Sequence, residues 1–268
     1  MKIILLVTIY NKLLEDSTSL YSFFFRCQDY HDKIQLYIWD NSDKFFSQDL
    51  SFIPTSVHYR YYKSPINMSL SKVYNTVIKD HNDFDFFINF DQDSSFSCLY
   101  FDILFNSIQN YIDDVALYAP QIVYNSKCVS PARKGIIKNH YINEMKAGVY
   151  NSKNMLVITS GVVVDLRCLR DVGLQYDENL SLYGIDLKFS IDYSRYFDKI
   201  CVLDYSLDHD LSRFDSQENK STKLFRLKNS FKADCYIASL GRYSLFAYLY
   251  LYARYIYNKI AILLANKC

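Results

Sequence analysis

Glycine and proline are scarce in this 268-residue chain, with six and four copies respectively. Collagen-like repeats and disordered segments rich in these two residues are therefore excluded. Half of the residues are hydrophobic, 26 of them Tyr and 19 Phe, and 22% are charged. A chain of this length and composition can bury a substantial core, so we expect one large domain, alone or with an appendage.

Cysteine occurs in an odd number, seven, and no two copies have the C-x-x-C spacing. This pattern argues against a disulfide framework and against a cysteine-rich zinc site. Reduced thiols are typical of cytoplasmic proteins, and we expect the cytoplasm to be the compartment of this chain.

Long hydrophobic runs are also missing, because no segment reaches the ~20 uninterrupted apolar residues that span a bilayer. The chain opens with a short apolar run, Ile3–Ile9, of a kind that signal peptides also contain. No small-residue cleavage site follows this run, so a buried first strand is favoured. The G-x-G-x-x-G and P-loop motifs are absent, which disfavours ordinary dinucleotide and P-loop sites.

Apolar runs of strand length alternate with segments of helical periodicity along most of the chain. Strands are predicted at residues 3–9, 34–39, 57–62, 84–90, 115–119, 157–164 and 199–203, and helices at 13–30, 70–78, 99–111, 168–173 and 185–196. Such alternation predicts an α/β fold in which helices flank a mostly parallel, Rossmann-like sheet. Residues 124–154 are largely polar and basic, and we predict a long surface loop there.

Polar side chains follow several of the predicted strands at the point where each strand ends. In open α/β sheets ligands bind at the carboxyl ends of the strands, so these side chains could meet in one crevice. The set is Thr8, Asn11, Asp40, Asn67, Asp91 and Asp93.

The sharpest motif is Asp91-Gln92-Asp93, which directly follows the predicted strand 84–90. Two carboxylates one residue apart can face one divalent cation, and Mg²⁺ or Mn²⁺ prefers oxygen ligands that it shares with phosphates. The alternative is a simple turn, since Asp and Ser are common turn formers. The other polar strand ends upstream favour the metal site.

Three further side chains have both a functional and a structural interpretation. Asp40 could accept a hydrogen bond from the N–H of a uracil or thymine ring, or it could cap a turn. Asp186, at the start of a predicted helix, could be a general base or could cap that helix. His209 could bind a metal as neutral imidazole, although a lone histidine is more often structural.

From about residue 3 to residue 211 the chain resembles the family 2 glycosyltransferases, which have the GT-A fold. The group that it resembles most is the rhamnosyltransferase-like one of bacterial O-antigen and capsule synthesis. Ser69 stands where this family usually has Gly, and the extra acid common near the base is missing before Asp186. The matching segments are Val7-Thr8-Ile9-Tyr10-Asn11, Trp39-Asp40-Asn41-Ser42, residues 67–75, Asp91-Gln92-Asp93-Ser94, Thr159-Ser160-Gly161, residues 182–189 and His209.

This resemblance implies an inverting transfer of one sugar from a dTDP- or UDP-type donor to a glycan or lipid-linked glycan acceptor. It implies that Asp186 is the catalytic base and that Asp93 and His209 bind Mg²⁺ or Mn²⁺. The nucleotide-binding residues that it implies are Thr8, Asn11, Asp40, Asn67 and Asp91.

Charge is distributed unevenly, because nine of the 30 Lys and Arg but only one of the 29 Asp and Glu follow residue 219. Residues 243–265 are rich in Tyr, Leu and Ile, but Arg254 and Lys259 interrupt them, which favours an interfacial helix over a spanning one. We predict a catalytic domain at 1–215 and a basic helical tail at 216–268 on the inner face of the cell membrane. Packing on the domain or on a second subunit is the alternative, and nucleic acid is not an expected partner.

Two other classes of protein fit parts of the pattern. A phosphatase of the haloacid-dehalogenase type also carries D-x-D after a strand, although there the pair follows the first strand and precedes Thr or Val. A non-catalytic membrane adaptor that binds a nucleotide or sugar is the second alternative.

Overall fold

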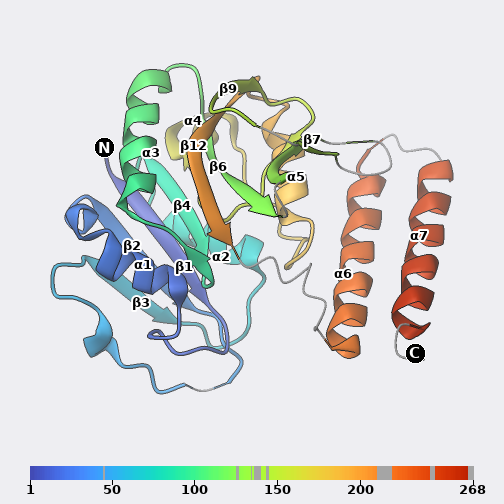
Figure 1. Ribbon diagram of the computed structural model, residues 1–268, viewed down its shortest axis with the longest axis horizontal. Coiled ribbons are helices and arrows are strands. Elements are labelled where there is room, and N and C mark those ends of the chain that lie inside the picture. Colours follow the sequence, from blue (N-terminus) through green and yellow to red (C-terminus); the bar gives the residue numbers. More distant parts are fainter. Residues whose placement is uncertain are drawn as a thin grey trace.

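The computed structural model (Figure 1) describes residues 1–44, 46–124, 127–133, 135, 140–142, 145–209, 219–241 and 245–264. For Tyr124, Asp208 and His209 it describes the backbone only. The predicted domain boundary between residues 215 and 216 lies outside the described residues, and the two-domain division stays a prediction.

A parallel sheet with the strand order β3-β2-β1-β4 forms the first half of the molecule. Its strands are β1 (Ile3–Ile9), β2 (Ile34–Asp40), β3 (Tyr59–Lys63) and β4 (Phe86–Asp91). The connecting helices are α1 (Thr18–Arg26), α2 (Leu70–Asp80) and α3 (Cys98–Tyr111), with short 3-10 helices η1 (Gln28–Tyr30) and η2 (Leu50–Phe52). The predicted alternation of strands and helices is confirmed. The first helix begins later than predicted because Ser17 caps it, accepting from the Leu20 N–H at 3.3 Å.

Mixed strands extend the sheet beyond β4 in the order β4-β11-β6-β7-β10, with β12 parallel to β6. The strands are β5 (Ser94–Ser95), β6 (Leu117–Tyr124), β7 (Lys127–Arg133), β8 (His140–Ile142), β9 (Gly148–Asn151), β10 (Met155–Leu156), β11 (Val162–Asp165) and β12 (Lys199–His209). The remaining helices of the body are α4 (Leu166–Val172) and α5 (Ile185–Tyr193).

The predicted surface loop at 124–154 is wrong, because this segment holds β7, β8 and β9. β7 pairs antiparallel with β6 and buries its middle, including Val129, while Lys127 and Arg133 at its two ends stay exposed. Lys127 and Arg133, two of the basic residues that suggested a loop, therefore stand at strand ends, where water can solvate them. Pairing of β7 with β6 and of β9 with β12 satisfies backbone groups of the described strands.

The sheet separates two hydrophobic cores because successive side chains of a strand point to opposite faces. Leu5 and Val7 of β1 face a core covered by α1 and α3, where Phe23 and Phe101 are buried. Ile4 and Leu6 face the core of α2, α4 and α5. Helices therefore cover both faces, as the α/β prediction requires.

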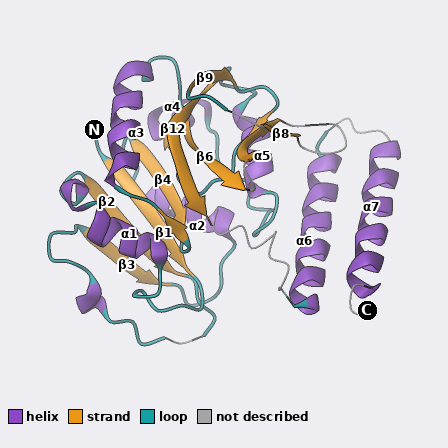
Figure 2. Cartoon of the chain, viewed as in Figure 1, coloured by secondary structure: helices purple, strands orange, loops and turns teal. Residues whose placement is uncertain are grey.

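Two further helices, α6 (Lys220–Ser239) and α7 (Leu245–Leu264), form an antiparallel pair beside the sheet (Figure 2). Ala233 and Ile237 of α6 are buried in the second core, and the Tyr236 hydroxyl donates to Asp177 at 2.9 Å. α7 contacts α6 through the Phe231–Tyr255 ring stack, whose centroids lie 4.5 Å apart. The predicted C-terminal helical appendage is confirmed, and α6 packs on the body.

None of the helices in the described ranges combines the length and the apolar content that crossing a bilayer requires. α7 is the most exposed of the long helices, since none of its residues is buried.

Candidate active site

The carboxyl ends of β1, β2 and β4 finish at the same level of the sheet. Thr8 lies opposite Asp91 in the β1–β4 pairing, and Ile9 lies opposite Asp40 in the β1–β2 pairing. Three of the predicted site residues are thus neighbours across adjacent strands.

Asp40 is fully buried and orders the segment that follows β2. Its carboxylate accepts from the Ser42 N–H at 3.0 Å, the Tyr61 hydroxyl at 2.9 Å and the Lys63 ammonium at 3.3 Å. Burial by itself raises the pKa of this carboxyl, but the bonds from Ser42 and Tyr61 and the Lys63 charge outweigh burial and lower it. Asp40 is therefore held ionised beneath the site surface.

Asn41 joins the end of β2 to the segment that precedes α2. Its Nδ2 donates to Asn67 Oδ1 at 2.9 Å and to the Met68 carbonyl at 2.8 Å, and its Oδ1 accepts from the Met68 N–H at 2.9 Å. The predicted residue Asn67 is thereby brought to the same edge. Asn41 was missed as a site residue, although it belongs to the Trp39-Asp40-Asn41-Ser42 motif.

Asn11 continues this network on the β1 side. It has a left-handed backbone, with φ of 51°, which Asn tolerates better than most residues. Its N–H donates to Ser42 Oγ at 2.8 Å, and its Oδ1 accepts from the Lys44 N–H at 3.3 Å. The turn after β1 is thus fixed to the turn after β2.

The Asp91-Gln92-Asp93 turn between β4 and β5 is anchored from the first turn of α1. Ser17 Oγ donates to the Gln92 carbonyl at 2.9 Å, and Ser19 Oγ donates to the Asp91 carbonyl. The Gln92 side chain accepts from the Tyr10 N–H at 2.8 Å. None of these three anchoring residues was predicted, because serines at a helix start have no marking beyond capping.

Thr159 and Ser160 connect this turn to Asp186. Thr159 Oγ1 donates to Asp186 Oδ1 at 2.9 Å. Ser160 Oγ accepts from the Asp91 N–H at 3.2 Å and lies 2.7 Å from Ser94 Oγ. The predicted base and the predicted metal motif are therefore joined through two consecutive residues.

Tyr74 of α2 lies near both Asp91 and Asp186 and was also missed from the sequence. Burial raises the pKa of its hydroxyl well above the usual value, and the nearby charges of Asp91 and Asp186 raise it further. The Asn89 side chain donates to this hydroxyl at 3.3 Å. A neutral phenol therefore lies near both carboxylates.

The backbone of His209 lies opposite Ser94 in the β12–β5 pairing, and Ser94 directly follows Asp93 in the sequence. β12 was predicted to end at residue 203, and its continuation to residue 209 is what carries this histidine to the turn. The His209 side chain lies outside the described residues. Its assignment as a metal ligand stays a prediction.

Within the described residues no three His, Cys, Asp or Glu side chains gather into a protein-only metal cluster. Mg²⁺ is commonly held by one or two carboxylates together with substrate phosphates. The carboxylates of Asp91 and Asp93 stand on one turn between β4 and β5. This oxygen donor set fits a hard cation that a diphosphate would help to bind.

No protein-family model matches the sequence, and no curated protein matches it either. Solved structures do match. S. aureus TarS 1–349 in complex with UDP-GlcNAc gives a TM-score of 0.58 at 12% identity, covering 99% of this chain and 74% of that chain. The same protein in complex with UDP gives a TM-score of 0.59 at 14% identity, covering 98% of this chain and 90% of that chain. GalNAc-T7 with UDP, GalNAc and Mn²⁺ gives a TM-score of 0.58 at 14% identity, covering 87% of this chain and 47% of that chain.

The chain has a GT-A-like fold. At identities of 12 and 14% the likeness concerns the fold alone, and it confirms the predicted fold class. In this GT-A-like fold, Thr8, Asp40 and Asp91 stand at the carboxyl ends of adjacent strands, the edge where open α/β sheets bind ligands.

Proposed function

We propose that this protein is a glycosyltransferase that moves one sugar from a nucleotide-diphosphate sugar to a glycan or lipid-linked glycan. The observation that carries the proposal is the hydrogen-bonded path from Asp186 through Thr159 and Ser160 to the Asp91 backbone. This path supports the proposal because it joins the candidate base to the turn that carries the candidate cation site. The UDP, UDP-GlcNAc and Mn²⁺ bound in the similar structures support a nucleotide-sugar donor.

The nucleotide lies, in this proposal, over the carboxyl ends of β1, β2 and β4. Thr8 Oγ1 is buried and has no hydrogen-bond partner among the described residues, so a polar group of a ligand would satisfy it. Asp40 already accepts from four protein donors, Ser42, Gln48, Tyr61 and Lys63, and this geometry supports a role in ordering the turn beneath the nucleobase. A direct bond to a uracil or thymine N–H, as the resemblance implies, would replace one of those donors.

Mg²⁺ or Mn²⁺ binds Asp93 in this proposal, with His209 as a further ligand. Such an ion, shared with the diphosphate, would stabilise the negative charge that develops on the leaving group. Asp91 holds the ribose in the same arrangement.

Asp186 is the proposed base that takes the proton from the acceptor hydroxyl. The hydroxyl oxygen then bonds to the anomeric carbon while the bond to the nucleoside diphosphate breaks on the opposite face, so the configuration inverts. The Thr159 hydroxyl fixes the orientation of the carboxylate. By the resemblance, we place the reaction in surface-polysaccharide synthesis, with a rhamnosyltransferase-like donor of UDP or dTDP type.

Two substitutions separate the proposed roles. Asp186→Asn should lower the rate of transfer by about 10²- to 10⁴-fold, the usual contribution of a general base, and leave UDP binding unchanged. Asp93→Ala should remove the part of UDP or dTDP binding that depends on Mn²⁺, measured by isothermal titration calorimetry with and without the ion. The matched control is Asp171→Asn, at an exposed carboxylate of α4.

The rival functions predict different results in the same samples. An adaptor would bind the nucleotide with no turnover in any variant, and a phosphatase would release phosphate from a phosphomonoester. If Asp93→Ala retains full Mn²⁺-dependent nucleotide binding, the assignment of the cation site is wrong.

The tail extends the proposal to the inner face of the cell membrane. α7 exposes an apolar stripe, with Leu245 72%, Phe246 80% and Tyr257 73% accessible. Arg254 and Lys259 are its only charged residues, and both are basic. A stripe of this kind beside basic side chains is suited to an anionic lipid surface.

A further inference from the structure

A cavity of about 800 Å³ lies between the body and the α6–α7 pair. One wall consists of β7, β10 and residues 157–158 with the start of α5, and the other of α6 and α7. Asp186 is among the lining residues, so the cavity opens directly on the proposed base. Its volume falls in the range of about 300–1,000 Å³ typical of sites for small organic ligands.

Aliphatic side chains are the largest class in this lining, with twelve of its 25 residues. Tyrosine rings could serve a sugar or a hydrocarbon equally well, so the aliphatic residues decide between the two. Ser230 and Asn258 are the only lining residues with a neutral hydroxyl or amide side chain other than tyrosine. A carbohydrate that filled the whole cavity would place hydroxyls against these aliphatic side chains, where they would lack hydrogen-bond partners, which is costly. The aliphatic lining residues are Val129, Ala132, Leu156, Val157, Ile158, Leu182, Leu187, Leu227, Ala233, Leu251, Ala261 and Ile262.

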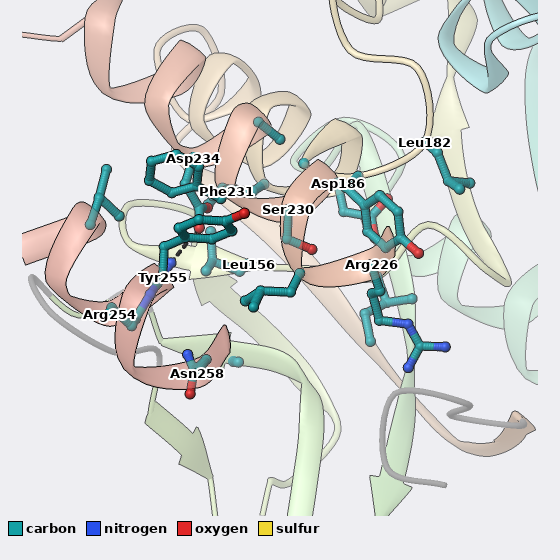
Figure 3. Close-up of a pocket in the computed structure, with 18 of the residues that line it drawn as sticks. Leu156, Leu182, Asp186, Arg226, Ser230, Phe231, Asp234, Arg254, Tyr255 and Asn258 are labelled. Carbon is teal, nitrogen blue, oxygen red and sulfur yellow. Dashed lines mark hydrogen bonds and ion pairs between the residues drawn. The ribbon is translucent and has the colours of Figure 1, made fainter. Parts of the chain in front are cut away.

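Charge is placed unevenly along the cavity. Figure 3 shows Asp186 and Arg226 at one end, the Arg254–Asp234 ion pair at the other, and Ser230 between them. Lys223 also belongs to the lining, so three basic and two acidic side chains give it a net positive charge. An anionic ligand group is therefore favoured beside the basic side chains of Arg226 and Lys223.

We propose that this cavity binds the acceptor, and that the acceptor is an amphiphile with a hydrocarbon chain and a phosphate. The sugar hydroxyl meets Asp186, the phosphate lies near Arg226 and Lys223, and the chain packs on the aliphatic walls. This inference rests on the proposed glycosyl transfer and narrows its acceptor to the lipid-linked class.

Alkyl phosphates test the inference without knowledge of the natural acceptor. Dodecyl phosphate and butyl phosphate, each below its critical micelle concentration, are titrated into the full-length protein in a calorimeter. Each buried methylene strengthens binding about fourfold, so dodecyl phosphate should bind at least about a hundredfold more tightly than butyl phosphate. UDP with Mn²⁺ is titrated into the same preparations.

A cavity-filling variant locates the site. Ser230→Trp should weaken dodecyl phosphate binding at least tenfold and leave UDP binding unchanged, because Ser230 lines the cavity and is not among the buried residues of α6. Ser239→Trp is the matched control, the same change at an exposed position of the same helix outside the lining. Asn258→Trp fills the cavity from α7, a helix with no buried residue. It replaces Ser230→Trp in this test if that variant does not fold.

The outcomes distinguish the two proposals. UDP binding with equal affinities for the two alkyl phosphates overturns the acceptor inference and leaves the proposed transfer intact. If Ser230→Trp and Asn258→Trp both leave the chain-length-dependent binding unchanged, the alkyl phosphate binds outside the cavity. That result also overturns the acceptor inference. Alkyl phosphate binding without any UDP binding refutes the proposed function, and the acceptor assignment with it.

Discussion

Asp40 illustrates how a single buried charge shapes the edge of the sheet. Its side chain is fully buried and accepts from Tyr61 and Lys63 of β3 and from Ser42 in the turn after β2. An ionised group in such a place is stabilised only while its donors are present, and its removal leaves them unsatisfied. Asp40 is therefore a residue on which both the stability and the shape of the site depend.

Asp40→Asn should destabilise the protein by about 2 kcal/mol at neutral pH, since bonds to a charged group are replaced by weaker ones. The pKa of Asp40 is lowered on folding, so its stabilising contribution is present above the unfolded pKa of about 3.9 and lost as pH falls through the lower folded value. Urea unfolding of both proteins between pH 7 and pH 2.5 measures this.

The two unfolding curves should thus converge only below about pH 4. Asp171→Asn, at an exposed site, should show no such pH-dependent difference. A constant gap between Asp40→Asn and the parent chain at all pH values would contradict the role of the charge.

At the scale of secondary-structure elements, the packing of α6 against the start of α5 determines which residue can precede the proposed base. α5 begins after Gly184, whose φ is 80°, and Asp186 follows two residues later. A Cβ at Gly184 would lie 2.9 Å from the Ala233 Cβ and 3.2 Å from the Ile237 Cδ1, both on α6. The close packing of α6 thus requires glycine at the start of the helix that carries the proposed base.

Gly184→Ala should therefore destabilise the protein by about 2–4 kcal/mol, combining left-handed backbone strain with overpacking against α6. Gly173→Ala is the matched control, because Gly173 also has a positive φ, 66°, but a Cβ there meets nothing within 4 Å. That control should cost about 1–2 kcal/mol, the strain alone. Urea unfolding midpoints measure the stability of both variants. Equal losses of stability would show that contact with α6 does not restrict the residue at position 184.

At the scale of the whole molecule, charge and apolar surface are concentrated at one side. α6 and α7 hold the basic tail, and α7 exposes apolar side chains that include Leu245, Phe246 and Tyr257. The cavity lies between this pair and the body, so the proposed acceptor would reach Asp186 from the side of the molecule on which the proposed membrane contact lies.

Vesicle sedimentation tests membrane contact. The full chain should bind vesicles that contain phosphatidylglycerol, and Phe246→Ser or Leu249→Ser should weaken this binding by about tenfold or more, as expected for the loss of one buried apolar side chain. Leu99→Ser, at an exposed leucine of α3, is the control. Unchanged vesicle binding, or a dimer that the α7 variants dissociate, would favour the alternative of a second subunit.

The sequence alone determined the alternation of strands and helices and the group of polar strand ends. Both are local properties, since hydrophobic periodicity is set within about ten residues and side chains at carboxyl ends of parallel strands must lie at one edge. The positions of Thr8, Asp40 and Asp91 follow from this rule alone.

Tertiary structure decided what depends on partners far along the chain. β9 became a strand because β12 pairs with it, β12 continued to His209 because β5 pairs with it, and Thr159 bonds to Asp186, 27 residues away. The cavity exists only where α6 and α7 stand against the body. No local pattern encodes such pairings, because their free energy comes from surfaces that meet only after the chain has folded.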